Sequence, residues 1–148
     1  MVAAGRIYSV GYEGLTLPGL VERLVQSKVT VLFDVRLNAV SRRTGFSKKA
    51  LASGLANAGI EYLHAPLLGN PPENRDSFRA GNGSAGRAAM RARLENGSRG
   101  AVEDLAARAV RERIAVMCVE RNRCTCHRDV ITDMVVELEP EIEVLHLL

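Results

Sequence analysis

The stretch TVLFDV, from Thr30 to Val35, is a continuous apolar run that ends in Asp34 and Val35 and is followed by Arg36. A strand of this composition is typical of a parallel sheet that is covered on both faces, because a half-exposed strand alternates apolar and polar residues instead. Segments with helical periodicity lie on both sides of the run in the sequence. We therefore expect TVLFDV to be a strand of an α/β fold.

Two helices are predicted beside this strand by their apolar spacing and by the residues at their ends. The apolar residues of segment 16–28 fall on one helical face, with Thr16 as the expected N-cap and Pro18 in the first turn. After a polar loop, Ser47 is the expected cap of a second helix, which Gly59 closes. These signals place one helix before the strand and one after it.

The same alternation of strands and helices continues along the whole chain. It predicts one domain, residues 1–148, folded as a Rossmann-like three-layer α/β sandwich with a mostly parallel sheet of about five strands and helices on both faces. Segment 67–83 is rich in Gly, Pro and Asn and is predicted to be a lid, a binding loop or disordered. The expected strands are 6–10, 30–35, 60–66, 114–120 and 141–148, and the expected helices are 16–28, 48–58, 84–96, 101–113 and 127–139.

Composition and charge restrict the function only loosely. The chain has 148 residues, a formal net charge of +3 and a pI near 9.0, which is too mildly basic to indicate nucleic-acid binding by itself. Arginines are concentrated in three segments, Ser41–Lys49, Gly86–Arg93 and Glu120–Arg128. The planar guanidinium suits phosphate or carboxylate groups, although the middle segment is interpreted as a solvated helix face.

The expected location is the cytoplasm. No stretch is long and apolar enough to span a membrane, and the first residues lack the features of a signal peptide. All three cysteines lie between Cys118 and Cys126. An odd number in one short segment is not a disulfide framework, so we expect reduced thiols.

Polar and titratable residues follow the predicted strands. In parallel α/β sheets, ligands bind at the carboxyl ends of the strands, near the point where the strand order reverses. A purely structural protein does not need this concentration of polar groups at one end of its sheet. The residues in these positions are Tyr12, Glu13, Asp34, Arg36, Ser41, Arg42, Arg43, His64, Cys118, Glu120, Cys126, His127 and Arg128.

The motifs YSVGYEG, LFDVRLNAVSRRTGFSKKAL, GIEYLHAPLLGN and the C-x-E … C-H-R pattern occur in this order and resemble the DUF488 family of small bacterial and archaeal proteins. The resemblance covers nearly the whole chain. It implies an α/β domain that shares the polar residues named above, and it implies no activity because that family is uncharacterised. The chain departs from the family pattern at Leu37, Ala39 and Val40, and Cys124 is an additional thiol.

The segment CVERNRCTCHR, from Cys118 to Arg128, allows three interpretations. Cys118, Cys124, Cys126 and His127 are a zinc set by ligand type, but their spacing differs from paired C-x₂₋₄-C motifs. We therefore predict no metal and no cofactor, and keep a Cys/His metal site as a lesser alternative. In the second interpretation, Cys126 is a thiolate activated by a helix N-terminus beside His127 and Arg128. In the third, Cys118 belongs to the core and Cys124 is incidental.

Two functional hypotheses follow, and the sequence leaves open whether the protein is an enzyme. The first is a small enzyme acting on an anionic substrate such as a phosphate, nucleotide or nucleic acid. Its candidate catalytic residues are Cys126, His127, Glu120, Asp34 and His64, and its candidate substrate-binding residues are Tyr12, Glu13, Arg36, Ser41, Arg42, Arg43 and Arg128.

The second hypothesis is a non-catalytic nucleic-acid-binding or interaction module. It uses the basic segment Ser41–Lys49, in which Phe46 could stack on a base. The polar residues could also form a structural network beneath a loop, with Asp34 and Arg36 as an ion pair. The expected partner is an anionic small molecule or a nucleic acid, and not a membrane; the sequence leaves homo-oligomerisation open.

Overall fold

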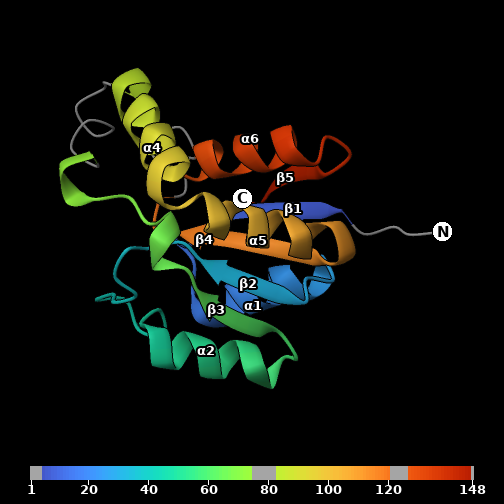
Figure 1. The fold of residues 1–148 in the computed structure, drawn as a ribbon. Coiled ribbons are helices and arrows are strands. Elements are labelled where there is room, and N and C mark those ends of the chain that lie inside the picture. Colours follow the sequence, from blue (N-terminus) through green and yellow to red (C-terminus); the bar gives the residue numbers. More distant parts are fainter. Residues whose placement is uncertain (1–4, 75–82, 121–126, 148) are drawn as a thin grey trace.

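The computed structural model describes residues 5–74, 83–120 and 127–147. Its strands form one five-stranded sheet in the order β3-β2-β4-β1-β5, and each adjacent pair is parallel (Figure 1). This confirms the predicted α/β class. The strands are β1 (Arg6–Gly11), β2 (Val31–Asp34), β3 (Glu61–His64), β4 (Arg113–Cys118) and β5 (Glu143–Leu147).

Helices cover both faces of the sheet and complete the predicted three layers (Figure 1). On one face, Leu20, Leu24, Leu51 and Leu55 of α1 and α2 pack against side chains such as Leu32. On the other face, the apolar sides of α4, α5 and α6 pack against the alternate residues of the same strands. The helices are α1 (Leu17–Gln26), α2 (Lys48–Asn57), α4 (Gly83–Gly97), α5 (Arg99–Arg111) and α6 (Arg128–Leu138), with a 3₁₀ turn, η1, at Pro66–Leu68.

β2 lies inside the sheet, between β3 and β4, and is buried along its whole length, as its apolar run predicts. β3 and β5 lie at the two edges of the sheet and are only partly buried. This difference follows from topology, because an edge strand has a neighbour on one side only. None of the helices in the described ranges has the length and apolar content needed to cross a bilayer.

The end signals of α1 and α2 are confirmed in part. Thr16 is the N-cap of α1, and its hydroxyl accepts a hydrogen bond from the Gly19 N–H at 3.1 Å. Gly59 follows the end of α2 with φ +78°. Ser47 occupies the N-cap position of α2 without capping it, because its hydroxyl instead accepts from the Ser41 N–H at 3.0 Å and donates to the Ser41 carbonyl at 3.2 Å. The same serine therefore closes the loop that precedes the helix.

The segment that follows β3 is more ordered at its start than the sequence indicates. After η1, the buried Asn74 amide donates to Asn70 Oδ1 at 2.7 Å and to the Gly86 carbonyl at 2.9 Å. These bonds tie the segment to the first turn of α4. Residues 75–82 lie outside the described part of the chain, so the prediction of a lid stays a prediction.

The connections that follow β1 and β4 cross opposite faces of the sheet. These strands are neighbours, but α1 leaves β1 on one face of the sheet and α6 leaves β4 on the other. The backbone pairing extends past both strands, with the Tyr12 N–H donating to the Cys118 carbonyl at 3.1 Å and the Glu13 N–H to the Val119 carbonyl at 2.9 Å. The carboxyl ends of β1, β4 and β2 therefore frame the region where such folds bind ligands.

Candidate functional site

A buried ion pair occupies the carboxyl end of β2. The Arg36 guanidinium donates through Nε to Asp34 Oδ1 at 2.8 Å and through Nη2 to Oδ2 at 2.6 Å. The Arg36 backbone N–H also donates to Oδ1, at 3.1 Å. The side chain of Asp34 is 0% exposed and that of Arg36 is 4% exposed. The ion pair that the sequence left as an alternative is therefore present, in the bidentate geometry that arginine forms best.

Arg36 also fixes the loop that precedes α2. Its Nη1 donates to the Phe46 carbonyl at 2.6 Å and lies 3.5 Å from the Tyr12 hydroxyl. Burial lowers the pKa of Arg36, but the hydrogen bonds and the negative charge of Asp34 outweigh burial, and the net pKa is raised. The guanidinium therefore stays charged, and most of its N–H groups are already used within the protein.

Two aromatic rings pack beside this guanidinium. Tyr12 and Phe46 stack with their centroids 4.3 Å apart and their planes 9° from parallel, and the Arg36 guanidinium carbon lies 5.4 Å from the Tyr12 centroid. Phe46 is fully buried. It therefore joins the loop to the core, and its ring cannot stack on a nucleic-acid base in this conformation.

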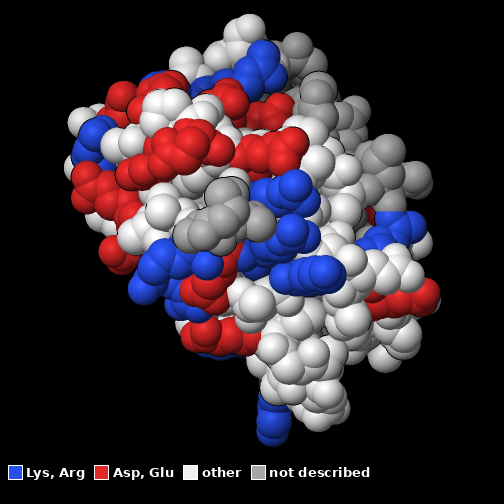
Figure 2. Space-filling view, turned by 90° about the vertical axis from the view of Figure 1, so that its right-hand side faces the viewer, with Lys and Arg blue, Asp and Glu red and all other residues white. Residues whose placement is uncertain are grey.

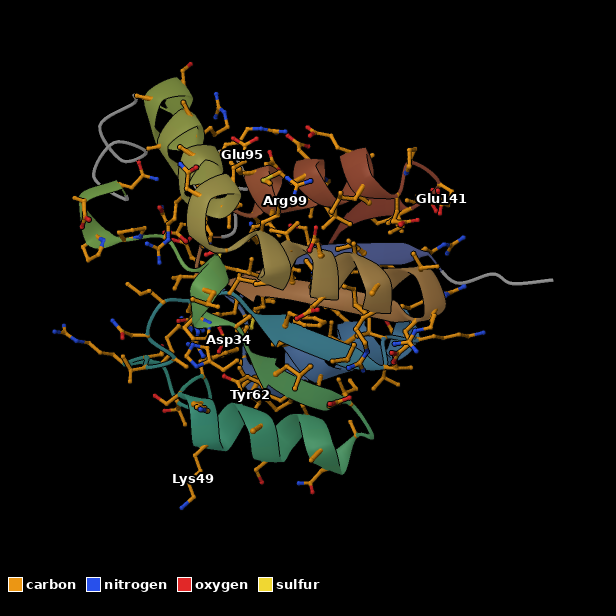
Figure 3. The ribbon with its side chains drawn as sticks, in the orientation of Figure 1. Asp34, Lys49, Tyr62, Glu95, Arg99 and Glu141 are labelled. Carbon is orange, nitrogen blue, oxygen red and sulfur yellow. The ribbon has the colours of Figure 1, made fainter. Side chains whose placement is uncertain are left out.

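Tyr62 completes the surroundings of the Asp34 carboxylate. Its hydroxyl donates to Asp34 Oδ2 at 2.6 Å, and the two side chains lie together at the carboxyl end of the sheet (Figure 3). Burial, followed by the hydrogen bond to Asp34 and its negative charge, raises the pKa of Tyr62 well above its ordinary value. The phenol is thus held in its neutral, donating form.

Two histidines form hydrogen bonds with the carbonyl groups of two consecutive residues just after β2. His64 Nε2 lies 2.9 Å from the Arg36 carbonyl, and His127 Nε2 lies 2.9 Å from the Val35 carbonyl. A carbonyl only accepts, so Nε2 of each ring carries the proton and Nδ1 carries the lone pair when the ring is neutral. His127 is buried and His64 is half-buried. Of the two, His64 is the better placed to exchange a proton with a ligand.

The end of β4 contains a disulfide. Cys118 is buried in the core, as expected, but it is disulfide-bonded, so the expectation of reduced thiols is wrong for this residue. Glu120 Oε2 lies 3.6 Å from its sulfur. Arg128, at the start of α6, is 1% exposed and donates from Nη2 to the Glu120 carbonyl at 2.7 Å. Arg128 therefore binds the backbone of Glu120, two residues after the end of β4.

The exposed arginines of the site lie in the loop before α2. Ser41 Oγ accepts from the Arg43 N–H at 3.1 Å, and the Arg43 guanidinium donates to the Leu15 carbonyl. This bond joins the loop to the start of α1. Between the two segments lies an open hollow of about 660 Å³, which is lined by Leu15, Thr16, Leu17, Pro18, Arg42, Arg43, Thr44 and Gly45.

A family described as a domain of unknown function, DUF488, matches residues 16–135. The chain belongs to the DUF488 family. No curated protein and no solved structure matches the chain. Membership of this family confirms the resemblance and assigns no reaction.

The predicted site residues of this DUF488 domain fall into two groups. Asp34, Arg36, Tyr12, His127 and Arg128 are buried and bonded within the protein. A second group is partly or fully exposed at the same end of the sheet, namely Glu13, Ser41, Arg42, Arg43, His64 and Glu120. The four arginines predicted to bind substrate therefore do not line one open pocket, because Arg36 and Arg128 are buried whereas Arg42 and Arg43 are exposed. Cys124 and Cys126 lie outside the described residues, so the activated thiolate stays a prediction.

Tyr62 is central to the site, but the sequence did not identify it as a site residue, and it named Phe46 only as a ring that could stack on a base. Tyr62 lies on β3 two residues before His64, and this spacing on a strand at the site was the available signal. Within the described ranges, no group of three or more Cys, His, Asp or Glu side chains is arranged to hold a metal ion. The proposed zinc set includes Cys124 and Cys126, which are outside these ranges.

Proposed function

We propose that this DUF488 domain is a small enzyme that binds an anionic substrate, a phosphate ester or a nucleotide, in the hollow between the loop before α2 and the start of α1. The observation that carries the proposal is that two neighbouring arginines, Arg42 and Arg43, both line this hollow. Arg43 uses one guanidinium nitrogen to hold Leu15, and guanidinium groups have five N–H donors. The remaining donors of both arginines suit phosphate oxygens.

The buried network supports this proposal as the scaffold of the arginine loop. Arg36 holds the Phe46 carbonyl, Ser47 holds both backbone groups of Ser41, and the Tyr12 ring packs on Phe46. A loop fixed at three points loses little conformational entropy when a ligand binds. The buried residues act as positioning residues, and the two exposed arginines contact the substrate.

His64 is the described residue best suited to proton transfer in the proposed reaction. Its Nε2–H bond to the Arg36 carbonyl orients the ring and leaves Nδ1 as the basic nitrogen. Glu13 and Glu120 supply carboxylates at the same end of the sheet. The predicted role of Cys126 as a nucleophile requires a thiolate, and therefore requires that Cys126 is not the partner of the Cys118 disulfide. The proposed reaction class is hydrolysis or transfer at a phosphorus or acyl centre.

Calorimetric titration of inorganic phosphate, ADP and a short single-stranded RNA into the full chain tests the binding step. Arg42→Gln and the Arg42→Gln/Arg43→Gln pair should weaken the ligand that binds by about tenfold or more, because each removes a charge-assisted contact. Arg99→Gln on α5 is the matched control, since Arg99 is an exposed arginine paired with Glu103. Equal affinities in all four proteins would reject the hollow as the binding site.

Turnover of phosphate esters and acyl esters tests the catalytic step separately. We expect His64→Gln to lower kcat with little change in KM, because it removes a proton carrier rather than a charge contact. Cys126→Ser examines the predicted nucleophile in the same assay. Tight RNA binding with no turnover of any ester would instead favour the non-catalytic nucleic-acid module.

A further inference from the structure

The charge of the chain is divided between two parts of the sequence. Residues 128–148 contain one arginine and six carboxylates, a formal charge of −5, and the remainder of the chain therefore has +8 to give the total of +3. These carboxylates belong to α6, β5 and the turn between them. Figure 2 looks at the amino ends of the strands and shows the acidic residues gathered in its upper part, the level of α6, with lysines and arginines in the middle.

β5 is an edge strand next to this acidic helix. Among the described strands it pairs only with β1. The Glu143 N–H donates to the Gly5 carbonyl at 2.8 Å, so the backbone groups of Glu143 point toward β1. Backbone direction alternates along a strand, and Val144 therefore turns its N–H and C=O toward the open edge. An edge of this kind is a template for one more strand.

A groove lies between β5 and α6. Its volume is about 580 Å³, and it is lined by Asp129, Thr132, Asp133, Val136, Glu137, Ile142, Val144 and His146. Its floor is partly apolar, and three carboxylates four residues apart on α6 line its helix side. Burial, together with the negative charges of Asp129 and Glu137, raises the pKa of Asp133. Arg91 forms an ion pair with Glu137, and the positive charges of Arg91 and Arg87 oppose this shift of the Asp133 pKa without cancelling it.

The spacing of these carboxylates matches that of an extended peptide. On a helix, residues four apart rise by about 6 Å. On a strand, every second side chain rises by about 6.6 Å and lies on the same face. A strand placed beside β5 with a basic residue at every second position would therefore bring successive cations to Asp129, Asp133 and Glu137.

We propose that the open edge of β5 and the groove beside it are a docking surface for an extended, basic polypeptide segment of a partner protein, which adds as a sixth strand. Hydrogen bonds to backbone groups such as those of Val144 give the alignment, and the carboxylates of α6 select lysine or arginine at alternate positions. A second copy of this chain docked through the same edge would bring two sets of these carboxylates together. Like-charge repulsion therefore excludes that pairing.

A labelled, end-blocked peptide of about seven residues that alternates lysine and valine is the probe. Fluorescence anisotropy with the full chain at low salt should show saturable binding. Asp133→Lys should weaken this binding by about tenfold, because it turns an attraction into a repulsion. Asp104→Lys, at an exposed position of α5, makes the same charge change outside the groove and should leave the affinity within about twofold.

A second pair of measurements separates strand addition from general attraction of charge. The same peptide methylated on alternate backbone nitrogens keeps its charge but loses its edge donors, and it should bind at least about tenfold more weakly. Amide chemical shifts should change along β5 and α6. Failure of the unmodified peptide to bind, or equal binding by the Asp133→Lys and Asp104→Lys proteins, would overturn the proposal. Equal binding of the methylated peptide would overturn the sixth strand.

We call β5 together with Asp129, Asp133 and Glu137 of α6 the acidic edge; its proposed peptide binding does not depend on the proposed function. Arg42→Gln/Arg43→Gln should leave the peptide affinity unchanged, since both residues line a different hollow. Conversely, Asp133→Lys should leave the binding of phosphate-bearing ligands unchanged. Loss of both activities in either protein would point to unfolding, which circular dichroism of the same samples detects.

Discussion

Tyr62 donates its hydroxyl to Asp34 across the pair of strands β2 and β3, at 2.6 Å. The carboxylate thereby receives hydrogen bonds from a phenol and from the Arg36 guanidinium together. In the register of the two strands, Tyr62 lies opposite Leu32, so its contact with Asp34 is a diagonal one between neighbouring strands. This contact joins the edge of the sheet to the buried ion pair.

The first prediction concerns Tyr62 and alkaline pH. A raised folded-state pKa means that the neutral phenol stabilises the fold below the ordinary value of 10.0, and that this contribution is lost as pH rises above it. Tyr62→Phe should lower the free energy of unfolding by about 1 kcal/mol at pH 7. Urea unfolding between pH 7 and 11 should show this difference shrinking above pH 10. A difference that stays constant over this range would contradict the assigned cause.

A second prediction concerns the ion pair. Arg36→Met should cost about 3–5 kcal/mol, because it leaves the Asp34 carboxylate buried without its cation and frees the Phe46 carbonyl. Arg36→Met combined with Asp34→Leu should be more stable than Arg36→Met alone, since the uncompensated charge is gone. Chemical unfolding of the three proteins measures this coupling. If the double variant were no more stable than the single one, the pair would not be the source of the loss.

The sequence predicted the architecture well because the relevant signals are local. The apolar run at Val31–Asp34, the N-cap Thr16 and the glycine at Gly59 each depend on a few neighbouring residues. The alternation of these elements then restricts the topology, because parallel strands need helical crossovers. The order of strands and helices also predicted that the polar residues lie at the carboxyl ends of the strands.

The side-chain partnerships within the site could not be predicted in the same way. The sequence offered Arg36, Arg42, Arg43 and Arg128 as one set, but burial separates them. Which arginine becomes buried depends on the register of β2 and on the packing of Phe46 against Tyr12, and both are tertiary. Ser47 likewise bonds to Ser41 instead of the helix end, because the loop brings a competing partner within reach.

A third prediction concerns a close approach of two loops at the site. A Cβ on Gly69 would lie 2.6 Å from the Leu37 Cα and 2.7 Å from its backbone nitrogen. Gly69→Ala should therefore force the backbones apart, at a cost of about 1–3 kcal/mol. Gly100→Ala is the matched control, because nothing lies within 4 Å of the added Cβ in the first turn of α5. It should be neutral or stabilising by up to about 1 kcal/mol. Thermal unfolding that ranks the two variants in the opposite order would refute the close approach.

A fourth prediction concerns the cysteines. The chain has three, and Cys118 is disulfide-bonded, so an intrachain disulfide leaves one thiol. Mass spectrometry after alkylation in denaturant should show one label without reductant and three with it. Reduction should also lower the free energy of unfolding, by up to about 3 kcal/mol for short closed loops. Three labels without reductant would return the cysteines to the reduced state that the sequence indicated.

The last prediction uses Asp133 to test the electrostatics of the acidic edge without a partner. Its folded-state pKa is raised, so the charged form is disfavoured in the fold, and stability is gained as pH falls toward the ordinary value of 3.8. Asp133→Asn should therefore stabilise the protein at pH 7. The gain is on the order of 0.5 kcal/mol, because solvent screens an exposed carboxylate.

This gain should fade toward pH 4. Burial is the largest cause of the raised pKa of Asp133, so high salt should remove only the part of the gain that comes from repulsion by Asp129 and Glu137. Asp104→Asn on α5 is the control for the loss of one charge, and its effect should be smaller at every pH. A destabilised Asp133→Asn protein at pH 7 would mean that the carboxylate is held by attraction. The Asp133 carboxylate would then already be stabilised within the protein, which would argue against its attracting a basic peptide segment.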